Sequence, residues 1–294
     1  MKVGVISDIH SNYYALKKVL KYLDGKIDYL ICTGDFVGYG PQPQECINIF
    51  LDYSLPFFVC LGNHDLGVRY SYSKYANNPL DSDYKILKTF NFRESALAML
   101  ELNAKDLLKD HFHFLLNLPF KQIFHIGQTK FYITHGTPSL RRTENVGRYL
   151  LPPPVQNPEV TIKRLKNDKK ADNADITIVG HTHRRFLVIR DNIFSWSLIE
   201  DILNKKPTKF PLKFSFHGNR IIFNPGSVGQ PRDGTGNASF SILDLDENAI
   251  EFNDLEYPVE ALYKLTNKYC VPEVQGPSFW ANKLGHFSKK PLTS

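Results

Sequence analysis

The amino-acid sequence predicts an α/β fold in which a pair of β-sheets is flanked by helices. Two observations favour this fold class. Short apolar runs end abruptly in polar, glycine-rich sequence, which is typical of strands covered on both faces. Helical sequence lies between several of these runs, whereas the later part of the chain is rich in strands with hairpin-like turns.

The elements can be assigned in order. Strands are expected in the apolar runs at residues 2–7, 28–34, 56–62, 130–134, 175–180 and 220–224, and in the later stretches 238–245 and 249–256. A first helix is predicted by the helical spacing of Ala15, Leu16, Val19, Leu20 and Leu23. Asn12 is its expected cap. Residues 92–103 and 105–118 carry broad apolar stripes that predict two more helices.

One domain is expected over residues 1–255, followed by a C-terminal extension over 256–294 that packs on it or trails it. Residues 192–219 are rich in Lys, Pro and Phe and are interpreted as an insertion. Together with the proline-rich loop at 150–158, this insertion could line or cap a site, or form a partner surface.

Composition excludes several classes of protein. Hydrophobic residues make up 42% and charged residues 22%, which is ordinary for a globular chain able to bury a core. No apolar stretch approaches the roughly 18 residues of a membrane span. The N-terminus turns polar too soon for a secretory signal, so a cytoplasmic location is expected. The four cysteines show no Cys-x-x-Cys spacing, which argues against a thiolate zinc site.

The net charge of +6 raises the question of a nucleic-acid partner. The basic residues concentrate in stretches that also carry Pro, Asn and Asp, at residues 163–170, at 205–213 and near Lys289. Such stretches are typical of solvated loops, so nucleic acid stays possible but is not favoured. Oligomeric state is left open.

Metal-capable side chains follow nearly every predicted strand. The set comprises Asp8, His10, Asp35, Asn63, His64, His135, His181 and His183. In α/β folds, ligands bind beyond the carboxyl ends of strands. The mixture of carboxylate, amide and imidazole suits one or two ions of Mn, Fe, Co, Ni or Zn better than Ca.

The spacing of these side chains supports the same interpretation. The pairs Asp8-x-His10 and His181-x-His183 would each place two ligand atoms on one side of an extended segment, because side chains alternate along a strand. Five other histidines lie in helical sequence, loops or strand edges and are interpreted as structural or surface residues: His111, His113, His125, His217 and His286.

These motifs resemble the five-block signature of calcineurin-like metallophosphoesterases. The blocks are Asp8-x-His10, Gly34-Asp35, Gly62-Asn63-His64-Asp65, His135-Gly136 and Gly180-His181-x-His183, in the order that the family has them. Residues 34–47 and 224–234 further resemble a branch of small bacterial and archaeal phosphodiesterases. The resemblance implies a two-sheet β-sandwich with helices on both outer faces.

The resemblance also implies roles. One metal ion would take Asp8, His10, Asp35 and His183, and a second would take Asp35, Asn63, His135 and His181. Manganese is the expected metal, with Fe, Zn, Co, Ni or Mg as alternatives. His64 would serve the leaving group, and Asp65 would orient or charge-balance His64. Two cations would neutralise a phosphate ester and lower the pKa of a bridging water.

Four further residues are candidate substrate contacts. The loop holding Gly226 and Ser227 could bring backbone N–H groups to a phosphate or a metal-bound histidine, or be a simple turn. Arg232 could contact phosphate or lie at the surface. Tyr39 could stack on a base or an aryl group, or pack in the interior.

The sequence therefore predicts a phosphodiesterase with two metal ions, acting on a small phosphoester or nucleotide. The sequence after Asp35 is "FVGYG" and lacks the Asp-Arg-Gly of protein Ser/Thr phosphatases, which disfavours phosphoprotein substrates. A nuclease, a phosphomonoesterase or a protein phosphatase on the same site remains an alternative. A non-catalytic scaffold on this fold is the other alternative.

Overall fold

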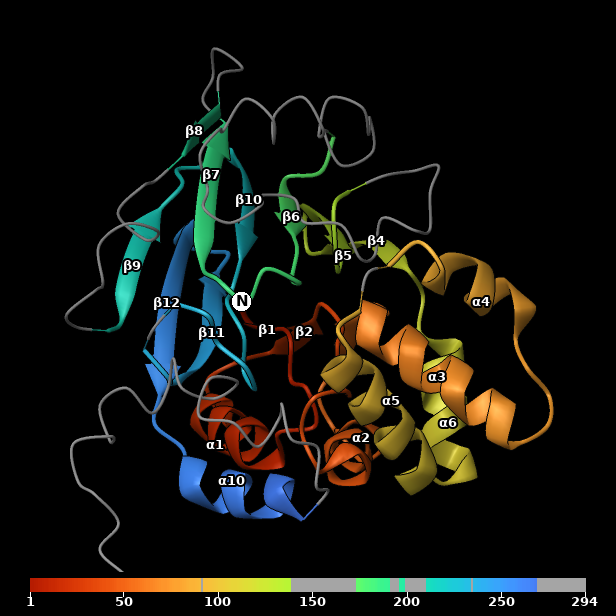
Figure 1. The fold of residues 1–294 in the computed structure, drawn as a ribbon. Coiled ribbons are helices and arrows are strands. Elements are labelled where there is room, and N and C mark those ends of the chain that lie inside the picture. Colours follow the sequence, from red (N-terminus) through yellow and green to blue (C-terminus); the bar gives the residue numbers. More distant parts are fainter. Residues whose placement is uncertain (91, 139–172, 191–195, 199–209, 234, 269–294) are drawn as a thin grey trace, which may run out of the picture.

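The structure is a computed structural model that describes residues 1–90, 92–138, 173–190, 196–198, 210–233 and 235–268. Two six-stranded sheets and, among the described residues, seven helices make up the fold (Figure 1). The predicted α/β class, a pair of sheets flanked by helices, is confirmed.

The first sheet has the strand order β3-β2-β1-β11-β12-β9. Its strands are β1 (Lys2–Ile6), β2 (Tyr29–Cys32), β3 (Phe57–Val59), β9 (Leu212–Ser215), β11 (Ala238–Asp244) and β12 (Ala249–Leu255). Strands β1, β2 and β3 are parallel, so their carboxyl ends meet at one edge. The other pairs are antiparallel.

The second sheet has the order β4-β5-β6-β10-β7-β8. Its strands are β4 (Lys121–Ile126), β5 (Thr129–Thr134), β6 (Ile176–Ile178), β7 (Phe186–Arg190), β8 (Trp196–Leu198) and β10 (Arg220–Asn224). Strands β5, β6 and β10 are parallel, so this sheet also gathers three carboxyl ends at one edge.

The helices are α1 (Tyr13–Leu23), α2 (Pro43–Leu51), α3 (Asn63–Tyr75), α4 (Asp81–Leu87), α5 (Glu94–Asp106), α6 (Lys109–Asn117) and α10 (Val259–Asn267). Helices α3 to α6 form one group beside the first sheet, and α1 lies next to α10 (Figure 1). The predicted cap of α1 is confirmed, since the side chain of Asn12 accepts a hydrogen bond from the Ala15 N–H at 3.1 Å.

Two apolar cores hold these layers together. One lies between the sheets and joins residues such as Val5 and Ile31 of the first sheet to Ile178 and Phe223 of the second. The other joins the first sheet to the helices and includes Leu16 of α1. Burial of this kind contributes roughly 25 cal/mol per Å² of apolar area. Strands of the first sheet alternate between the two cores, with Val5 and Ile31 in one and Ile6 and Leu30 in the other, which explains why their short apolar runs were recognisable as strands.

Parts of residues 192–219, which the sequence predicts to be an insertion, pair with both sheets. Leu212–Ser215 pairs with β12 as the edge strand of the first sheet, and Trp196–Leu198 pairs with β7 as the edge strand of the second. These segments complete the sheets, because each satisfies the open hydrogen bonds of a neighbouring strand. Residues 199–209, and the loop at 150–158, lie outside the described residues.

The start of the predicted C-terminal extension packs on the domain. Helix α10 buries Leu262, and the preceding Tyr257 is also buried in the core shared with the first sheet. Residues from 269 onward lie outside the described part of the chain. Cys32, Cys46 and Cys60 are buried free thiols. In the described part of the chain, no helix has the length and apolar character that crossing a membrane requires.

Candidate metal centre

The candidate site lies where the carboxyl ends of the parallel strands of both sheets meet. Asp8 follows β1, Asp35 follows β2 and Asn63 follows β3 at the start of α3. His135 follows β5, and the loop after β6 carries His181 and His183. The structure brings all seven predicted metal ligands to this place, each with 8% or less of its surface exposed.

The loops at the strand ends adopt left-handed backbone conformations. Asp8, His10, Asp35, His181 and His183 have φ angles of 53°, 50°, 54°, 68° and 56°. Such angles are uncommon for residues other than glycine and are strained. The predicted reason for the Asp-x-His and His-x-His pairs was therefore wrong: the side chains converge because the backbone turns sharply, not because an extended segment alternates.

The first group of side chains that could hold a metal ion is Asp8, His10, Asp35 and His183. Nε2 of His183 lies 3.2 Å from Oδ1 of Asp8 and 3.1 Å from Nε2 of His10. Nε2 of His10 lies 3.5 Å from Oδ2 of Asp35. Ligand atoms this close can surround a single cation.

The second group contains Asp35, His135 and His181. Nε2 of His135 lies 3.1 Å from Oδ2 of Asp35 and 3.1 Å from Oδ1 of Asn63. Asn63 was predicted as a ligand on this side. Asp35 is common to both groups, so its carboxylate lies between them.

Backbone carbonyl groups fix the tautomers of three histidines. The Nδ1 atoms of His10, His135 and His183 lie 3.3, 2.7 and 2.6 Å from the carbonyl oxygens of Val37, Thr33 and Gln230. A carbonyl oxygen only accepts, so each Nδ1 must carry a proton. In a neutral imidazole, Nε2 then presents its lone pair to the centre, which is the orientation that a metal ligand needs.

The donor set fits a cation. Burial lowers the pKa of both His10 and His183 well below the usual range, so both rings are neutral. Their Nε2 lone pairs face one another at 3.1 Å with no proton between them. Oδ2 of Asp35 is also buried and lies 3.1 Å from Nε2 of His135 and 3.5 Å from Nε2 of His10. A divalent ion at this point would turn these converging acceptors into ligands.

The charges in the site are coupled. Burial raises the pKa of Asp8 to about 7, and the negative charge of Asp35 adds to this effect. Burial opposes a charged His135, but the charge of Asp35 outweighs it and raises the pKa of His135 to about 9. When no cation is bound, His135 therefore carries a proton on Nε2 as well as on Nδ1 at neutral pH. Metal binding must release that proton.

Two glycines allow the loops to approach closely. A Cβ atom on Gly62 would overlap the backbone N and Oδ1 of Asp35. A Cβ atom on Gly180 would overlap Oγ of Ser7 and lie 3.0 Å from Oδ2 of Asp8. The glycines of the Gly62-Asn63 and Gly180-His181 motifs are thus required by the space that the carboxylates occupy.

His64 is buried beside the cluster and is surrounded by rings. Its ring centroid lies 4.8 Å from that of His10, 4.3 Å from Tyr39 and 5.3 Å from Phe92. Nδ1 of His64 faces Gly38, since a Cβ atom added to Gly38 would lie 2.5 Å from this nitrogen. Among the described residues, Nδ1 of His64 has no hydrogen-bond partner. Burial lowers the pKa of His64 to about 4. No local pattern in the sequence marked Phe92.

Asp65 requires a correction. The resemblance implied that it would orient or charge-balance His64, but no described group bonds to Nδ1 of His64, and the carboxylate whose charge raises the pKa of His64 against the effect of burial is that of Asp35. The carboxylate of Asp65 instead accepts the backbone N–H groups of Asp35, Val37 and Gly62 at 2.8, 3.1 and 2.9 Å. These contacts hold the loop after β2 against the start of α3, so Asp65 positions Asp35.

Gly226 and Ser227 lie in the loop for which the sequence left open a substrate contact or a simple turn. Ser227 is fully buried, and its hydroxyl group donates to the carbonyl oxygen of Asp8 at 2.8 Å. The N–H of Gly226 donates to Oδ1 of Asn224 at 2.8 Å. Both hydrogen bonds lie inside the protein, and the one from Ser227 supports the loop that carries Asp8; a contact of this loop with substrate stays a prediction.

Asn224 is a residue that sequence reasoning missed. Its Nδ2 donates to the carbonyl oxygen of Gly180 at 2.7 Å and lies 3.0 Å from Oγ1 of Thr182. It therefore holds the loop between His181 and His183. The signal available in the sequence was its position at the end of an apolar run, the same signal that marked the ligands.

The remaining predicted contacts lie close to the site. The backbone N–H of Arg232 donates to the carbonyl oxygen of His183 at 3.0 Å, and its positive charge adds to the effect of burial in lowering the pKa of His183. Tyr39 is half-buried, and its ring also contacts His10, at 4.8 Å between centroids. Both side chains therefore lie at the edge of the cluster.

The other histidines do not join the cluster. His111 is buried, with Nδ1 accepting the N–H of Leu108 and Nε2 lying 2.8 Å from Oδ1 of Asn48. His113, His125 and His217 are exposed. The predicted structural and surface roles are consistent with these positions. His286 lies outside the described residues.

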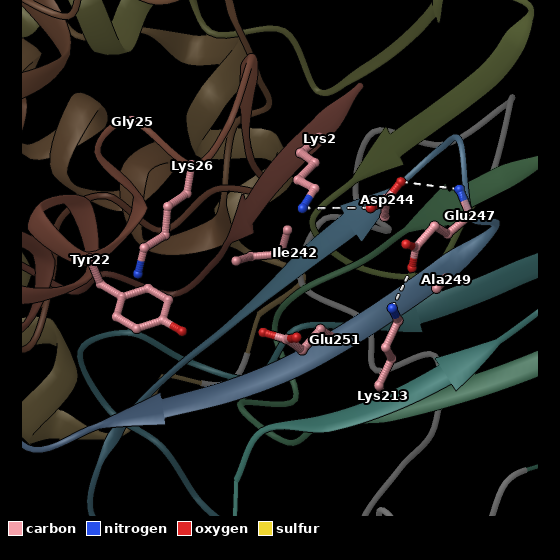
Figure 2. Close-up of a pocket in the computed structure, with 10 residues that line it drawn as sticks. All are labelled: Lys2, Tyr22, Gly25, Lys26, Lys213, Ile242, Asp244, Glu247, Ala249 and Glu251. Carbon is pink, nitrogen blue, oxygen red and sulfur yellow. Dashed lines mark hydrogen bonds and ion pairs between the residues drawn. The ribbon is translucent and has the colours of Figure 1, made fainter.

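A separate hollow of about 550 Å³ lies beside the first sheet and the end of α1 (Figure 2). Its basic groups have partners: Lys26 lies over the ring of Tyr22, Lys2 pairs with Asp244, and Lys213 pairs with Glu247. The three lysines of the lining face three carboxylates, those of Asp244, Glu247 and Glu251, so the lining has no excess of positive charge that would attract an anion.

Comparison with known proteins places this chain in a family. Residues 1–248 match the calcineurin-like phosphoesterase superfamily domain, so the chain belongs to this superfamily. Membership indicates a hydrolase that acts on phosphoesters, and the family normally binds divalent metal ions. The clustered aspartates and histidines agree with that property.

Relatives cover most of the chain. An uncharacterized protein of Methanocaldococcus jannaschii is 31% identical over 275 residues, which is 93% of this chain and 95% of that protein. The crystal structure of a metallophosphoesterase from Sphaerobacter thermophilus has a TM-score of 0.68 and 25% identity, and covers 96% of this chain and 98% of the other. A symmetrical bis(5'-nucleosyl)-tetraphosphatase of Wigglesworthia glossinidia brevipalpis is 26% identical over 107 residues, 36% of this chain and 39% of that protein.

Proposed function

We propose that this protein is a phosphoesterase with two metal ions that hydrolyses phosphodiester bonds of small or nucleotide-type substrates. The observation that carries the proposal is the position of Asp35 between two buried groups of metal-capable side chains. One ion would be held by Asp8, His10, Asp35 and His183, and the other by Asp35, Asn63, His135 and His181. Manganese suits this mixed donor set. The ions would supply Lewis acidity and activate a water at neutral pH.

Arg232 would bind a phosphate oxygen of the substrate. Its guanidinium group is close enough to the cluster to affect the pKa of Asp8, after burial and the charges of His135 and Asp35. Guanidinium groups bind phosphate through paired hydrogen bonds. The link between its backbone and His183 would keep Arg232 in register with the metal ligands.

His64 would act on the leaving group through Nε2, because Nδ1 faces Gly38. Burial lowers the pKa of His64 to about 4, so the ring is neutral in the free protein at neutral pH. An anionic substrate beside the ring raises that pKa, since a neighbouring negative charge favours the imidazolium form. His64 would thus be protonated when the substrate is bound and would give the proton to the departing oxygen.

Paired rates on bis-p-nitrophenyl phosphate and p-nitrophenyl phosphate with manganese-loaded protein test the proposal. We expect faster turnover of the diester, loss of activity on chelation, and a fall in kcat of about 10²–10⁴ in His64→Ala. His125→Ala, which removes an exposed histidine, is the matched control and should retain activity. Absence of turnover of any ester by protein that has bound metal would refute the enzyme and favour the scaffold alternative.

The likeness to a bis(5'-nucleosyl)-tetraphosphatase supports nucleotide-type substrates. A panel of dinucleoside polyphosphates, cyclic nucleotides and single-stranded oligonucleotides separates the alternatives. Preference for oligonucleotides would favour a nuclease, and preference for the monoester in the first assay would favour a phosphomonoesterase.

A further inference from the structure

Asn103 of helix α5 is buried, with 1% of its surface exposed, and its amide joins two turns at the metal centre. Its Oδ1 accepts the hydroxyl group of Ser11 at 2.5 Å and the N–H of Gly38 at 2.8 Å. Its Nδ2 donates to the carbonyl oxygen of Gly40 at 2.9 Å. One side chain from the helical layer thus holds both turns.

The two turns carry residues of the proposed reaction. Ser11 directly follows His10, and Gly38 and Gly40 enclose Tyr39. Ser11, Gly38 and Tyr39 have φ angles of 51°, 94° and 39°. Left-handed conformations are strained at residues other than glycine and persist only where the surroundings enforce them. Asn103 bonds to Ser11, Gly38 and Gly40, which form or flank these conformations, so its hydrogen bonds help to hold them.

The turns also touch the neighbouring groups of the site. The N–H of Gly40 donates to the carbonyl oxygen of His10 at 3.0 Å, and a Cβ atom on Gly40 would overlap that oxygen. Gly38 lies against Nδ1 of His64. A small shift of the Gly38–Gly40 turn must therefore move His10, the Tyr39 ring and the wall beside His64 together.

We infer that Asn103 is a positioning residue for the reaction proposed above, which fixes His10 and Tyr39 from the helical layer. The inference rests on the proposed function for its catalytic consequence, but its effect on metal affinity does not require turnover. The hydrogen bonds of Asn103 go to Ser11, Gly38 and Gly40, so it acts on His10 and Tyr39 through these neighbours.

A purely structural role of Asn103 must be distinguished. Helix α5 has other anchors: Leu107 is buried at its end, and Leu100 lies so close to α3 that a Cβ atom on Gly67 would be 2.6 Å from it. Leu107→Ala is therefore a matched control, because it weakens the packing of the same helix and removes no bond to the turns.

The test compares Asn103→Leu, Ser11→Ala, their double variant and Leu107→Ala. Competition with a chelator measures manganese affinity. Turnover of bis-p-nitrophenyl phosphate gives kcat and KM, and calorimetry gives the unfolding temperature. We expect Asn103→Leu to lower both manganese affinity and kcat by about 10–100-fold with little change in KM, as outer partners of metal ligands do. Leu107→Ala should lower the unfolding temperature but keep affinity and kcat within about twofold.

The second variant keeps the inference testable if Asn103→Leu folds poorly. Ser11→Ala removes one hydrogen bond and should lower manganese affinity by about threefold. The double variant should lose no more than Asn103→Leu, because the hydroxyl group has then already lost its partner.

The outcomes separate the two proposals. If Asn103→Leu and Ser11→Ala match Leu107→Ala in affinity and kcat, the positioning role is overturned, whatever the enzyme hydrolyses. If the wild-type protein binds manganese and hydrolyses no ester, the proposed function fails, whereas lower affinity in both variants would still support the positioning of His10. Failure of the wild-type protein to bind manganese would overturn both.

Discussion

Gly180→Ala is the substitution that tests most directly whether the close approach of the loops sets the metal centre. The added methyl group would overlap Oγ of Ser7, and it would lie 3.0 Å from Oδ2 of Asp8 and 3.1 Å from Nδ1 of His135. The Ser7 hydroxyl group donates to Oδ2 of Asp8 at 2.6 Å, so the methyl group must displace a partner of the carboxylate.

The expected size of the effect follows from this overlap. Overpacking of a buried site costs about 1–3 kcal/mol. An unfolding entropy of about 2.1 cal/mol/K per residue gives about 0.6 kcal/mol/K for 294 residues, so the unfolding temperature should fall by roughly 2–5 °C. Loss of the hydrogen bond from Ser7 to the carboxylate of Asp8 should weaken metal affinity by about 10–100-fold.

Calorimetry and chelator competition measure the two effects separately. Gly4→Ala is the matched control, because its Cβ atom would lie 2.8 Å from Cδ1 of Ile27, away from the metal ligands. It should lower the unfolding temperature and leave metal affinity unchanged. Adding Ser7→Ala to Gly180→Ala should restore part of the stability but not the affinity. Wild-type affinity in Gly180→Ala would refute the steric reasoning.

Three further predictions concern metal, charge and pH. Metal stabilises the protein because it binds only the folded state. With free metal at 100 times the Kd of a site, chelation should lower the unfolding temperature by about 4–5 °C for each site. An unchanged unfolding temperature would mean that the site does not bind metal. The guanidinium group of Arg69 is buried and bonds to the carboxylate of Asp83 at 2.6 Å, so Asp83→Asn should lower the free energy of unfolding by about 3–5 kcal/mol. Replacing both residues, Arg69→Met with Asp83→Leu, should recover most of that loss when unfolding is measured with denaturant. Burial lowers the pKa of His111, so the unfolded state takes up a proton first and stability should fall as pH drops below about 6.5. In His111→Gln, which keeps an acceptor for Leu108, melting curves should show a smaller fall between pH 7.5 and 5.5, and an equal fall would contradict the assignment.

The strands and the ligand set were predictable because both are local signals. A short apolar run ending in Asp35 or His135 shows the strand and the residue beyond its carboxyl end in a few adjacent letters. Helix α1 was predictable for the same reason, since Asn12 caps a helix only three residues away. The structure confirms these elements and brings the predicted ligands together.

The roles that the sequence did not reveal belong to residues whose partners are distant in sequence. Asp65 bonds to the N–H of Asp35, 30 residues earlier, and Ser227 bonds to the carbonyl oxygen of Asp8, 219 residues earlier. Strand β9 was taken for part of an insertion, because its only sign is its pairing with β12. No local pattern marks such pairings.

The sequence by itself determined which side chains could bind metal and on which strand ends they stand, because those depend on residue type and the period of apolar residues. Only the tertiary structure decided how they converge. Nε2 of His10 lies 3.1 Å from Nε2 of His183, a residue 173 positions away in the chain. Left-handed turns bring the two rings together, and backbone carbonyl groups select their tautomers. Such contacts depend on the packing of two sheets and a helical layer, and a single side chain such as Asn103 acquires its role only when those layers meet.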